Sequence, residues 1–308
     1  MCAQIHRFAV SVNCHLPDSA ACTDTLQDFE KLYRDDGVLI LPDGYTGSGT
    51  TTRLVINCHG AGGTVSSADS QIEHQALTQY LVANGYAVMD MNGLPKDLAA
   101  EHGIDLRNNV GSPIAVRCYV KGYRYCLEHF HLYPEVFVHG GSMGGITGAN
   151  LVLCGALPVI AHTAFCPVLD TYHQIFLHPW SDGLPKTALG KLYGLAVDGA
   201  GEYLYDEEKI AGYNPVRNKK AEAYPVPLKI WHCVDDETVA FDVSARFVRR
   251  VRDSGSYAEL RAFPYGGHEP QLVGKPVASP CGNAVFDGNA IPVTPAVEEA
   301  FLFIRNFS

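Results

Sequence analysis

The sequence has no run of about 18 apolar residues, the length that a helix needs to cross the hydrocarbon core of a membrane. The first residues, Met1 to Arg7, also lack the basic stretch and long apolar stretch that are typical of a secretory signal peptide. Apart from the short basic pieces 218–220 and 249–250, no Lys/Arg cluster offsets the formal net charge of −10, which argues against nucleic acid or an anionic membrane surface as a partner. We therefore expect a cytoplasmic protein that binds neither.

Cysteine spacing typical of metal or redox sites is also missing, because none of the ten cysteines belongs to a Cys-x-x-Cys pair. Cys58, Cys166 and Cys233 instead fall inside apolar, strand-like segments. We interpret them as buried thiols. Internal repeats and low-complexity stretches are absent as well, which excludes repeat architectures.

What the sequence does contain is an alternation of short apolar runs with helical patterns, in a chain that is 47% hydrophobic and 18% charged. This order predicts an α/β fold with a mostly parallel central sheet flanked by helices. The predicted strands are 37–41, 53–57, 86–91, 135–139, 159–167, 228–234 and 258–263. The predicted helices are 71–83, 113–132, 144–153, 243–252 and 295–307, with Ser112 as the N-cap of the second.

One segment, about 170–225, interrupts the alternation and carries many aromatic residues among glycine, proline and charged residues. We interpret it as a cap inserted into a single domain that spans residues 1–308. Among its aromatic side chains, Trp180 and Tyr172 are the first candidates for contact with a substrate.

Residues 140–145, Gly-Gly-Ser-Met-Gly-Gly, follow directly on the apolar strand 135–139. Glycine two positions before and after Ser142 allows a sharp strand-to-helix turn that exposes the serine above the edge of a sheet. The pattern predicts that Ser142 is a nucleophile.

A serine hydroxyl needs a base within hydrogen-bond reach and a third group that orients the base. His268 follows a predicted strand and a Gly-Gly pair, so we predict that it is the base. The strand 228–234 runs into three carboxylates, of which Asp236 is the predicted acid and Asp235 the alternative.

A second glycine-rich turn, His-Gly-Ala-Gly-Gly at 59–63, ends the strand 53–57. It is placed to aim backbone N–H groups at a developing oxyanion, and we predict Ala61 and Met143 as the two donors. His59 is expected to support the turn. A phosphate-binding loop is excluded because neither glycine cluster matches the dinucleotide pattern and Ile146 stands where a P-loop needs lysine.

Taken together, these motifs resemble the α/β-hydrolase family, and methionine after the nucleophile resembles its smaller serine esterases and its prolyl-oligopeptidase-like peptidase branch. The resemblance covers nearly the whole chain. It implies a Ser-His-Asp triad in the chain order nucleophile, acid, histidine, an oxyanion hole and an acyl-enzyme intermediate. These roles carry over to Ser142, Asp236, His268, Ala61 and Met143.

The leading functional hypothesis is hydrolysis of a small-molecule carboxylic ester, a reaction that requires no metal and no organic cofactor. One alternative is a small serine peptidase of the prolyl-oligopeptidase-like branch, although only some fifty residues precede the strand 53–57, too few for a propeller domain. The other is a hydrolase-fold protein that binds a ligand without catalysis. It is less favoured because all three triad positions are filled.

Overall fold

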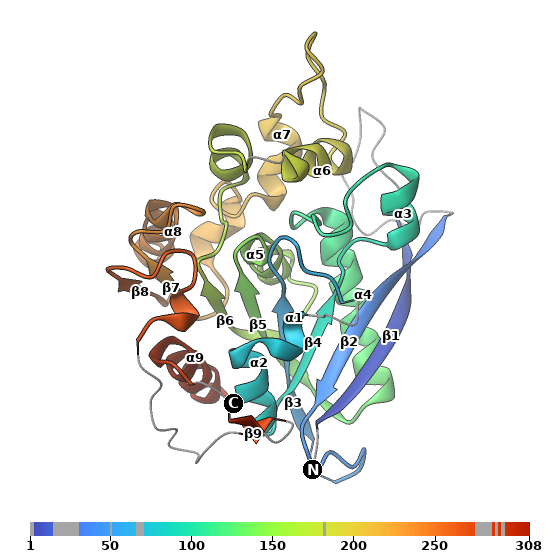
Figure 1. Ribbon diagram of the computed structural model, residues 1–308, viewed down its shortest axis with the longest axis vertical. Coiled ribbons are helices and arrows are strands. Elements are labelled where there is room, and N and C mark those ends of the chain that lie inside the picture. Colours follow the sequence, from blue (N-terminus) through green and yellow to red (C-terminus); the bar gives the residue numbers. More distant parts are fainter. Residues whose placement is uncertain are drawn as a thin grey trace.

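The computed structural model of the chain describes residues 3–14, 31–49, 51–65, 71–180, 183–274, 285–286, 289–290 and 293–308. Eight strands form one sheet in the order β1-β2-β4-β3-β5-β6-β7-β8 (Figure 1). They are β1 (Gln4–Asn13), β2 (Leu32–Leu41), β3 (Thr52–Cys58), β4 (Ala87–Met91), β5 (Leu132–Gly141), β6 (Val159–Phe165), β7 (Leu228–Cys233) and β8 (Ala258–Phe263). β2 is antiparallel to β1 and β4, and the other neighbours are parallel. The predicted mostly parallel sheet is confirmed.

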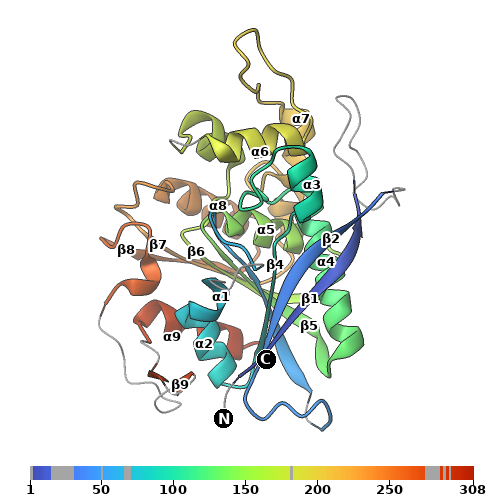
Figure 2. The same ribbon diagram turned by 45° about the vertical axis from the view of Figure 1, so that its right-hand side comes forward.

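Helices cover both faces of the sheet (Figure 2). The described helices are α1 (Gln71–His74), α2 (Ala76–Ala83), α3 (Lys96–Glu101), α4 (Pro113–His129), α5 (Gly144–Cys154), α6 (Leu184–Leu192), α7 (Glu207–Ile210), α8 (Phe241–Asp253) and α9 (Pro295–Arg305). Successive side chains of a strand point to opposite faces. In β5, Val136 and Val138 therefore join the core beneath α4 and α5, whereas Phe137 joins the core beneath α2 and α9.

Several predicted boundaries differ from the structure, most of all at β2, which begins at Leu32 and not at residue 37. Three of the differences have a clear local cause. The helix 71–83 is interrupted at Gln75, whose backbone is extended, so it becomes α1 and α2. The helix expected to reach residue 132 ends at His129 because Leu132 already begins β5. The strand 159–167 ends at Phe165 because Cys166 adopts a φ of 39°, which no strand tolerates. Ser112 does cap α4, since its hydroxyl accepts a hydrogen bond from the Ala115 N–H at 3.2 Å.

The segment between β6 and β7 lies above the carboxyl ends of the parallel strands (Figure 1). It holds a π-helical turn, η1 (Tyr172–Leu177), then α6, α7, and two 3₁₀ turns, η2 (Ala211–Tyr213) and η3 (Lys219–Ala223). α6 also lies beside α3, and Lys191 donates a hydrogen bond to the His102 carbonyl at 2.8 Å. That this segment acts as a cap on one domain stays a prediction.

The chain ends on the α2 side of the sheet, where α9 packs through Phe301 against Tyr80 of α2, with the ring centroids 4.9 Å apart. A 3₁₀ turn, η4 (Pro270–Leu272), precedes α9, as does a separate pairing of β9 (Val285–Phe286) with β10 (Asn289–Ala290). Within the described ranges, every helix is too short or too polar to cross a membrane.

Candidate active site

Ser142 occupies a sharp turn between β5 and α5 with a φ of 50°, a left-handed conformation that is strained for any residue with a side chain. The turn closes because the glycines on either side have no Cβ. A Cβ on Gly140 would lie 2.6 Å from the Gly144 carbonyl oxygen, and one on Gly144 would lie 1.9 Å from the Cys58 carbonyl oxygen. The glycine spacing read in the sequence therefore has a steric cause.

The end of the adjacent strand β6 holds the turn in place. The Ser142 N–H donates to the Phe165 carbonyl at 3.0 Å, and the Val168 N–H donates to the Ser142 carbonyl at 2.8 Å. Gly145 lies so close to Pro167 that a Cβ would approach the proline Cβ to 2.3 Å. The end of β6 thus fixes the backbone of Ser142 by hydrogen bonds and by packing.

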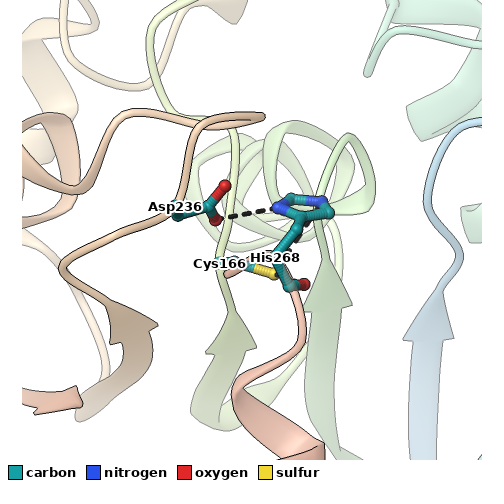
Figure 3. Close-up of side chains that lie close together, drawn as sticks. All are labelled: Cys166, Asp236 and His268. Atoms are coloured by element: carbon teal, nitrogen blue, oxygen red, sulfur yellow. Dashed lines mark hydrogen bonds and ion pairs between the residues drawn. The ribbon is translucent and has the colours of Figure 1, made fainter. Parts of the chain in front are cut away.

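A continuous chain of hydrogen bonds connects the three residues predicted to form the triad. His268 Nε2 lies 2.8 Å from Ser142 Oγ. His268 Nδ1 lies 2.8 Å from Asp236 Oδ2 (Figure 3). His268 comes from the loop after β8, and Asp236 from the turn after β7. Ser142 and His268 are partly accessible, whereas Asp236 is buried, with 8% of its surface exposed.

Each carboxylate oxygen of Asp236 accepts two hydrogen bonds. Oδ1 accepts hydrogen bonds from the N–H groups of Thr238 and Val239 at 2.8 and 2.9 Å, and Oδ2 is shared by His268 Nδ1 and by His232 Nε2 at 3.0 Å. Burial alone would raise the pKa of this carboxyl, but the hydrogen bonds from His232, His268 and Val239 outweigh it and hold the pKa well below its usual range. Asp236 is therefore a fixed anion at neutral pH.

Asp235, the alternative acid, has a different task. Its carboxylate accepts hydrogen bonds from the N–H groups of Gly266 and Gly267 at 3.2 and 2.9 Å. Both glycines have positive φ values, 136° and 60°, in the loop that carries His268. Asp235 thus anchors the histidine loop, and its carboxylate does not contact the imidazole.

His232 is a site residue that the sequence interpretation missed. It is completely buried in β7, and its Nδ1 lies 2.9 Å from the Ser244 hydroxyl of α8. The Nε2 atom, close to Asp236 Oδ2 and to the Val239 carbonyl, acts as the donor, because both of those atoms are acceptors. A polar residue next to the apolar pair Ile230–Trp231 in the strand, four positions before Asp236, was the available signal.

The loop after β3 lies directly beside Ser142. A Cβ on Gly60 would be 3.3 Å from the Ser142 Cβ, and Ala61 lines a cavity together with Ser142. Met143 is the N-cap of α5, at the end of a helix whose first N–H groups lack partners within it. The structure thus brings Ala61 and Met143 next to Ser142, and their action as oxyanion donors stays a prediction.

His59 supports this loop from below. Its ring packs on Gly63, where a Cβ would lie 3.0 Å from the imidazole Cδ2, and its Nδ1 lies 3.1 Å from Asp90 Oδ1. Asp90 is completely buried and also accepts hydrogen bonds from Asn57 at 2.8 Å and from the Tyr119 hydroxyl at 2.6 Å. Burial disfavours the charged imidazole, but Asp90 outweighs it and raises the pKa of His59.

Two cavities adjoin the Ser142–His268 pair, and both residues line each of them. The first has a volume of about 420 Å³ and extends past His59, Cys166 and Glu269. The second has a volume of about 430 Å³ and extends past Ala61 to Trp180 and α6.

The two aromatic residues predicted to contact the substrate are differently placed. Trp180 lies in the wall of the second cavity. Tyr172 instead packs against Tyr205 and Phe176, with ring centroids 4.6 and 6.4 Å away. Contact of either residue with a substrate stays a prediction.

Within the described residues, Cys166, Asp236 and His268 form a group whose metal-ligand atoms lie within 4.8 Å of one another (Figure 3). The Cys166 Sγ is 3.9 Å from His268 Nε2 and donates to the His268 carbonyl at 3.2 Å. Burial raises the pKa of this thiol far above its ordinary value, and the charges of Asp236 and Glu269 raise it further. A metal here would need a thiolate and would break the His268–Asp236 hydrogen bond, so the geometry fits proton transfer better.

Comparison of the sequence with protein-family models and with curated proteins gave no match. Comparison of the structure did. An acylaminoacyl peptidase from Pyrococcus horikoshii superposes with a TM-score of 0.63 at 16% identity, over 89% of this chain and 39% of that one. A puromycin-hydrolyzing peptidase from Mycobacterium tuberculosis gives 0.61 at 17%, over 89% and 36%.

An esterase from Thermogutta terrifontis, Est2, solved with propionate bound, gives a TM-score of 0.58 at 17% identity. The match covers 88% of this chain and 89% of the esterase, whereas the chain spans less than half the length of the two peptidases. The strand order, the turn that carries Ser142 and these superpositions agree with one another. The chain therefore has the α/β-hydrolase fold.

Proposed function

We propose that the protein is a serine hydrolase that cleaves carboxylic esters, with Ser142 as nucleophile, His268 as general base and Asp236 as the orienting acid. The observation that carries the proposal is the hydrogen-bond chain from Asp236 through His268 to Ser142, with both links at 2.8 Å. A serine on a strained turn, joined to an imidazole whose other nitrogen is held by an anion, is the arrangement that acyl transfer needs.

In the proposed reaction, Ser142 Oγ attacks the ester carbonyl while its proton passes to His268 Nε2. Asp236 keeps the Nδ1–H in place and stabilises the imidazolium. The tetrahedral oxyanion lies against the N–H groups of Ala61 and Met143, and each such donor is worth a factor of about 100 to 1,000 in turnover. His268 then protonates the leaving alcohol, and the same imidazole activates the water that releases the acid from Ser142.

The two cavities beside the Ser142–His268 pair provide space for groups on both sides of the scissile bond. Volumes of about 420 and 430 Å³ lie within the range of ordinary small-molecule sites. We propose that one cavity takes the acyl part and the other the alcohol part, and that Trp180 forms part of the wall against which the substrate packs.

A second candidate is a small serine peptidase. Glu269 lies in the wall of the first cavity together with Ser142, where its carboxylate is placed to pair with the amino group of a peptide. Peptidases are also among the proteins of similar structure. We rank this candidate second because the amine of an amide leaves less readily than the alcohol of an ester. Amide cleavage therefore demands more precise protonation of the leaving group by His268.

A fluorophosphonate probe tests the proposed chemistry, because it reacts covalently with an activated serine. The wild-type protein should be labelled and the Ser142→Ala variant should not. Failure of the folded wild type to react would contradict the serine-hydrolase assignment.

A substrate panel then separates the two candidates. Turnover of nitrophenyl acetate and butyrate, with at least 100-fold lower kcat/KM on aminoacyl and acylaminoacyl nitroanilides, supports the esterase. The reverse ranking supports the peptidase. In that case Glu269→Gln should raise the KM for substrates with a free amine and leave the acylated ones unchanged.

A further inference from the structure

A cavity of about 420 Å³ lies apart from the candidate active site, and Ser142, Asp236 and His268 take no part in its walls. It is enclosed by α4, by the second half of α5 and by the segment around η2 and η3. Val116, Val120 and Leu153, all buried, supply apolar surface to it. Its volume suits an organic ligand.

Four basic side chains stand around this apolar space. Arg117, Lys121 and Arg124 come from successive turns of α4, and Lys220 comes from η3. No acidic residue is among the described residues that line the cavity. In a chain with a net charge of −10, such a concentration of positive charge favours an anionic ligand.

Three of these four charges are also available for a ligand. Arg117 Nη1 donates to the Asn13 carbonyl at 2.7 Å, but within the described part of the chain Lys121, Arg124 and Lys220 form no ion pair. Surface lysines and arginines elsewhere commonly pair, as Lys186 does with Glu202 at 2.7 Å. At Lys121, Arg124 and Lys220 the cavity thus presents positive charge that no described acidic side chain pairs with.

A buried acceptor completes the lining. The Asn150 side chain is 2% exposed, and its Nδ2 donates to the carbonyls of Gly111 and Tyr213, both at 2.8 Å. Two carbonyl acceptors fix the orientation of the amide, which leaves Oδ1 as the acceptor, and among the described residues Oδ1 has no hydrogen-bond partner. A buried polar atom without a partner is costly, and Asn150 lines the cavity, so a ligand N–H or O–H that reaches Oδ1 after a small shift of the amide would be favoured.

We propose that this cavity binds an amphipathic organic anion, a molecule with an apolar body, one carboxylate or phosphate group and an N–H or O–H donor. The apolar body lies against Val116, Val120 and Leu153. The anionic group lies among Lys121, Arg124 and Lys220, and the donor group pairs with Asn150 Oδ1.

N-acetylphenylalanine has all three features and serves as the probe, with titration calorimetry of the wild-type protein at about 100 mM salt as the measurement. Three compounds each lack one feature: N-acetylphenylalaninamide lacks the charge, 3-phenylpropionate lacks the N–H, and inorganic phosphate lacks the apolar body. The proposal requires saturable binding of the probe and at least ten-fold weaker binding of the uncharged amide. Equal binding of the amide or of inorganic phosphate overturns it.

Matched variants assign the binding to this cavity. Lys220→Glu should lower the affinity for the probe at least ten-fold. Lys219→Glu makes the same charge change at an exposed neighbour that does not line the cavity, and it should leave the affinity within two-fold of the wild type. Equal effects of the two variants overturn the proposal. Ser142→Ala should bind the probe like the wild type, which keeps this test separate from that of the proposed hydrolase activity.

Discussion

Asp235 and Asp236 are neighbours in the chain, yet their carboxylates hold different parts of one loop. Asp236 Oδ2 lies 2.8 Å from the imidazole Nδ1 of His268. Asp235 instead accepts hydrogen bonds from the backbone N–H groups of the two glycines that precede His268 in the chain. The pair thus separates two tasks, because one carboxylate fixes the ring and the other fixes the loop that carries it.

This separation predicts unequal effects of the two amide substitutions. Asp236→Asn should lower kcat for a nitrophenyl ester about 1,000-fold or more, because the amide favours the wrong imidazole tautomer and cannot stabilise the imidazolium. Asp235→Asn should lower kcat by about ten-fold at most, since an amide oxygen still accepts one N–H. Steady-state kinetics of both variants provide the measurement, and a larger loss at Asp235 would reverse the assignment.

His232 should matter for stability through its hydrogen bond to Asp236. His232→Leu leaves a buried carboxylate with one donor fewer, so we expect the free energy of unfolding to fall by about 2 kcal/mol. His232→Gln can place an amide donor near the same point and should lose less. Urea unfolding of both variants is the measurement, and equal losses would show that volume, and not the hydrogen bond, is what β7 requires at this position.

Gly144 should not tolerate a methyl group. A Cβ there would lie 1.9 Å from the Cys58 carbonyl oxygen, so Gly144→Ala must displace either the turn or the end of β3. We expect a loss of about 3 kcal/mol or more in the free energy of unfolding. Gly199→Ala is the control, because a Cβ at Gly199 meets no atom within 4 Å. Similar thermal unfolding of the two variants would contradict the steric argument.

Trp180 should affect substrate binding more than turnover. It lines the same cavity as Ser142, so Trp180→Ala should raise KM about ten-fold for a bulky ester with little change in kcat. Tyr172→Ala tests the other aromatic candidate, which packs against Tyr205, and should mainly lower thermal stability. A kinetic effect of Tyr172→Ala without loss of stability would restore Tyr172 as a substrate contact.

Two buried histidines should each make the protein less stable on mild acidification, and the buried Asp35, whose pKa burial raises to about 7, opposes them in part. Burial lowers the pKa of His139 and of His162 to about 3 from 6.5. Below pH 6.5 the unfolded chain binds protons that the folded protein accepts only near pH 3. Each histidine therefore lowers the free energy of unfolding by about 1.4 kcal/mol per pH unit across this window and has no such effect above about pH 7.

Urea unfolding at pH 7, 6 and 5 measures this slope. His162→Asn keeps a polar group near the Tyr224 hydroxyl and removes one titrating ring, so the slope should become shallower by about 1.4 kcal/mol per pH unit. The exposed His129→Asn is the control and should leave the slope unchanged. An unchanged slope in His162→Asn would mean that other groups dominate the acid sensitivity.

The parallel core of the sheet could be predicted from the sequence because those strands are buried on both faces and appear as continuous apolar runs. β1 could not. It lies at the edge of the sheet, and its buried residues Phe8, Val10 and Val12 alternate with exposed or half-buried ones, so it shows no continuous apolar run. α3 was missed for a related reason, since six residues are too few to display a helical period.

The arrangement of Ser142, Asp236 and His268 could be predicted because each follows a recognisable strand and glycines or acidic residues mark the turns. His232 could not be predicted in this way. Its role depends on the return of the chain after Asp236, which brings Val239 and Ser244 around the same imidazole. The hydrogen bonds of His232 arise from tertiary packing, so a strand pattern in the sequence predicts the position of the residue but not its partners.

The hydrogen bonds between Ser142 and the end of β6 have a consequence for protein engineering. Phe165 and Val168 hold the serine backbone on one side, and Pro167 fills the space that Gly145 leaves. A hexapeptide with the sequence of residues 140–145, grafted after a strand in another scaffold, would lack these partners and would relax out of its strained conformation. The turn that carries Ser142 is portable only together with the neighbouring strand end, so a transplant of this site must include residues 165–168.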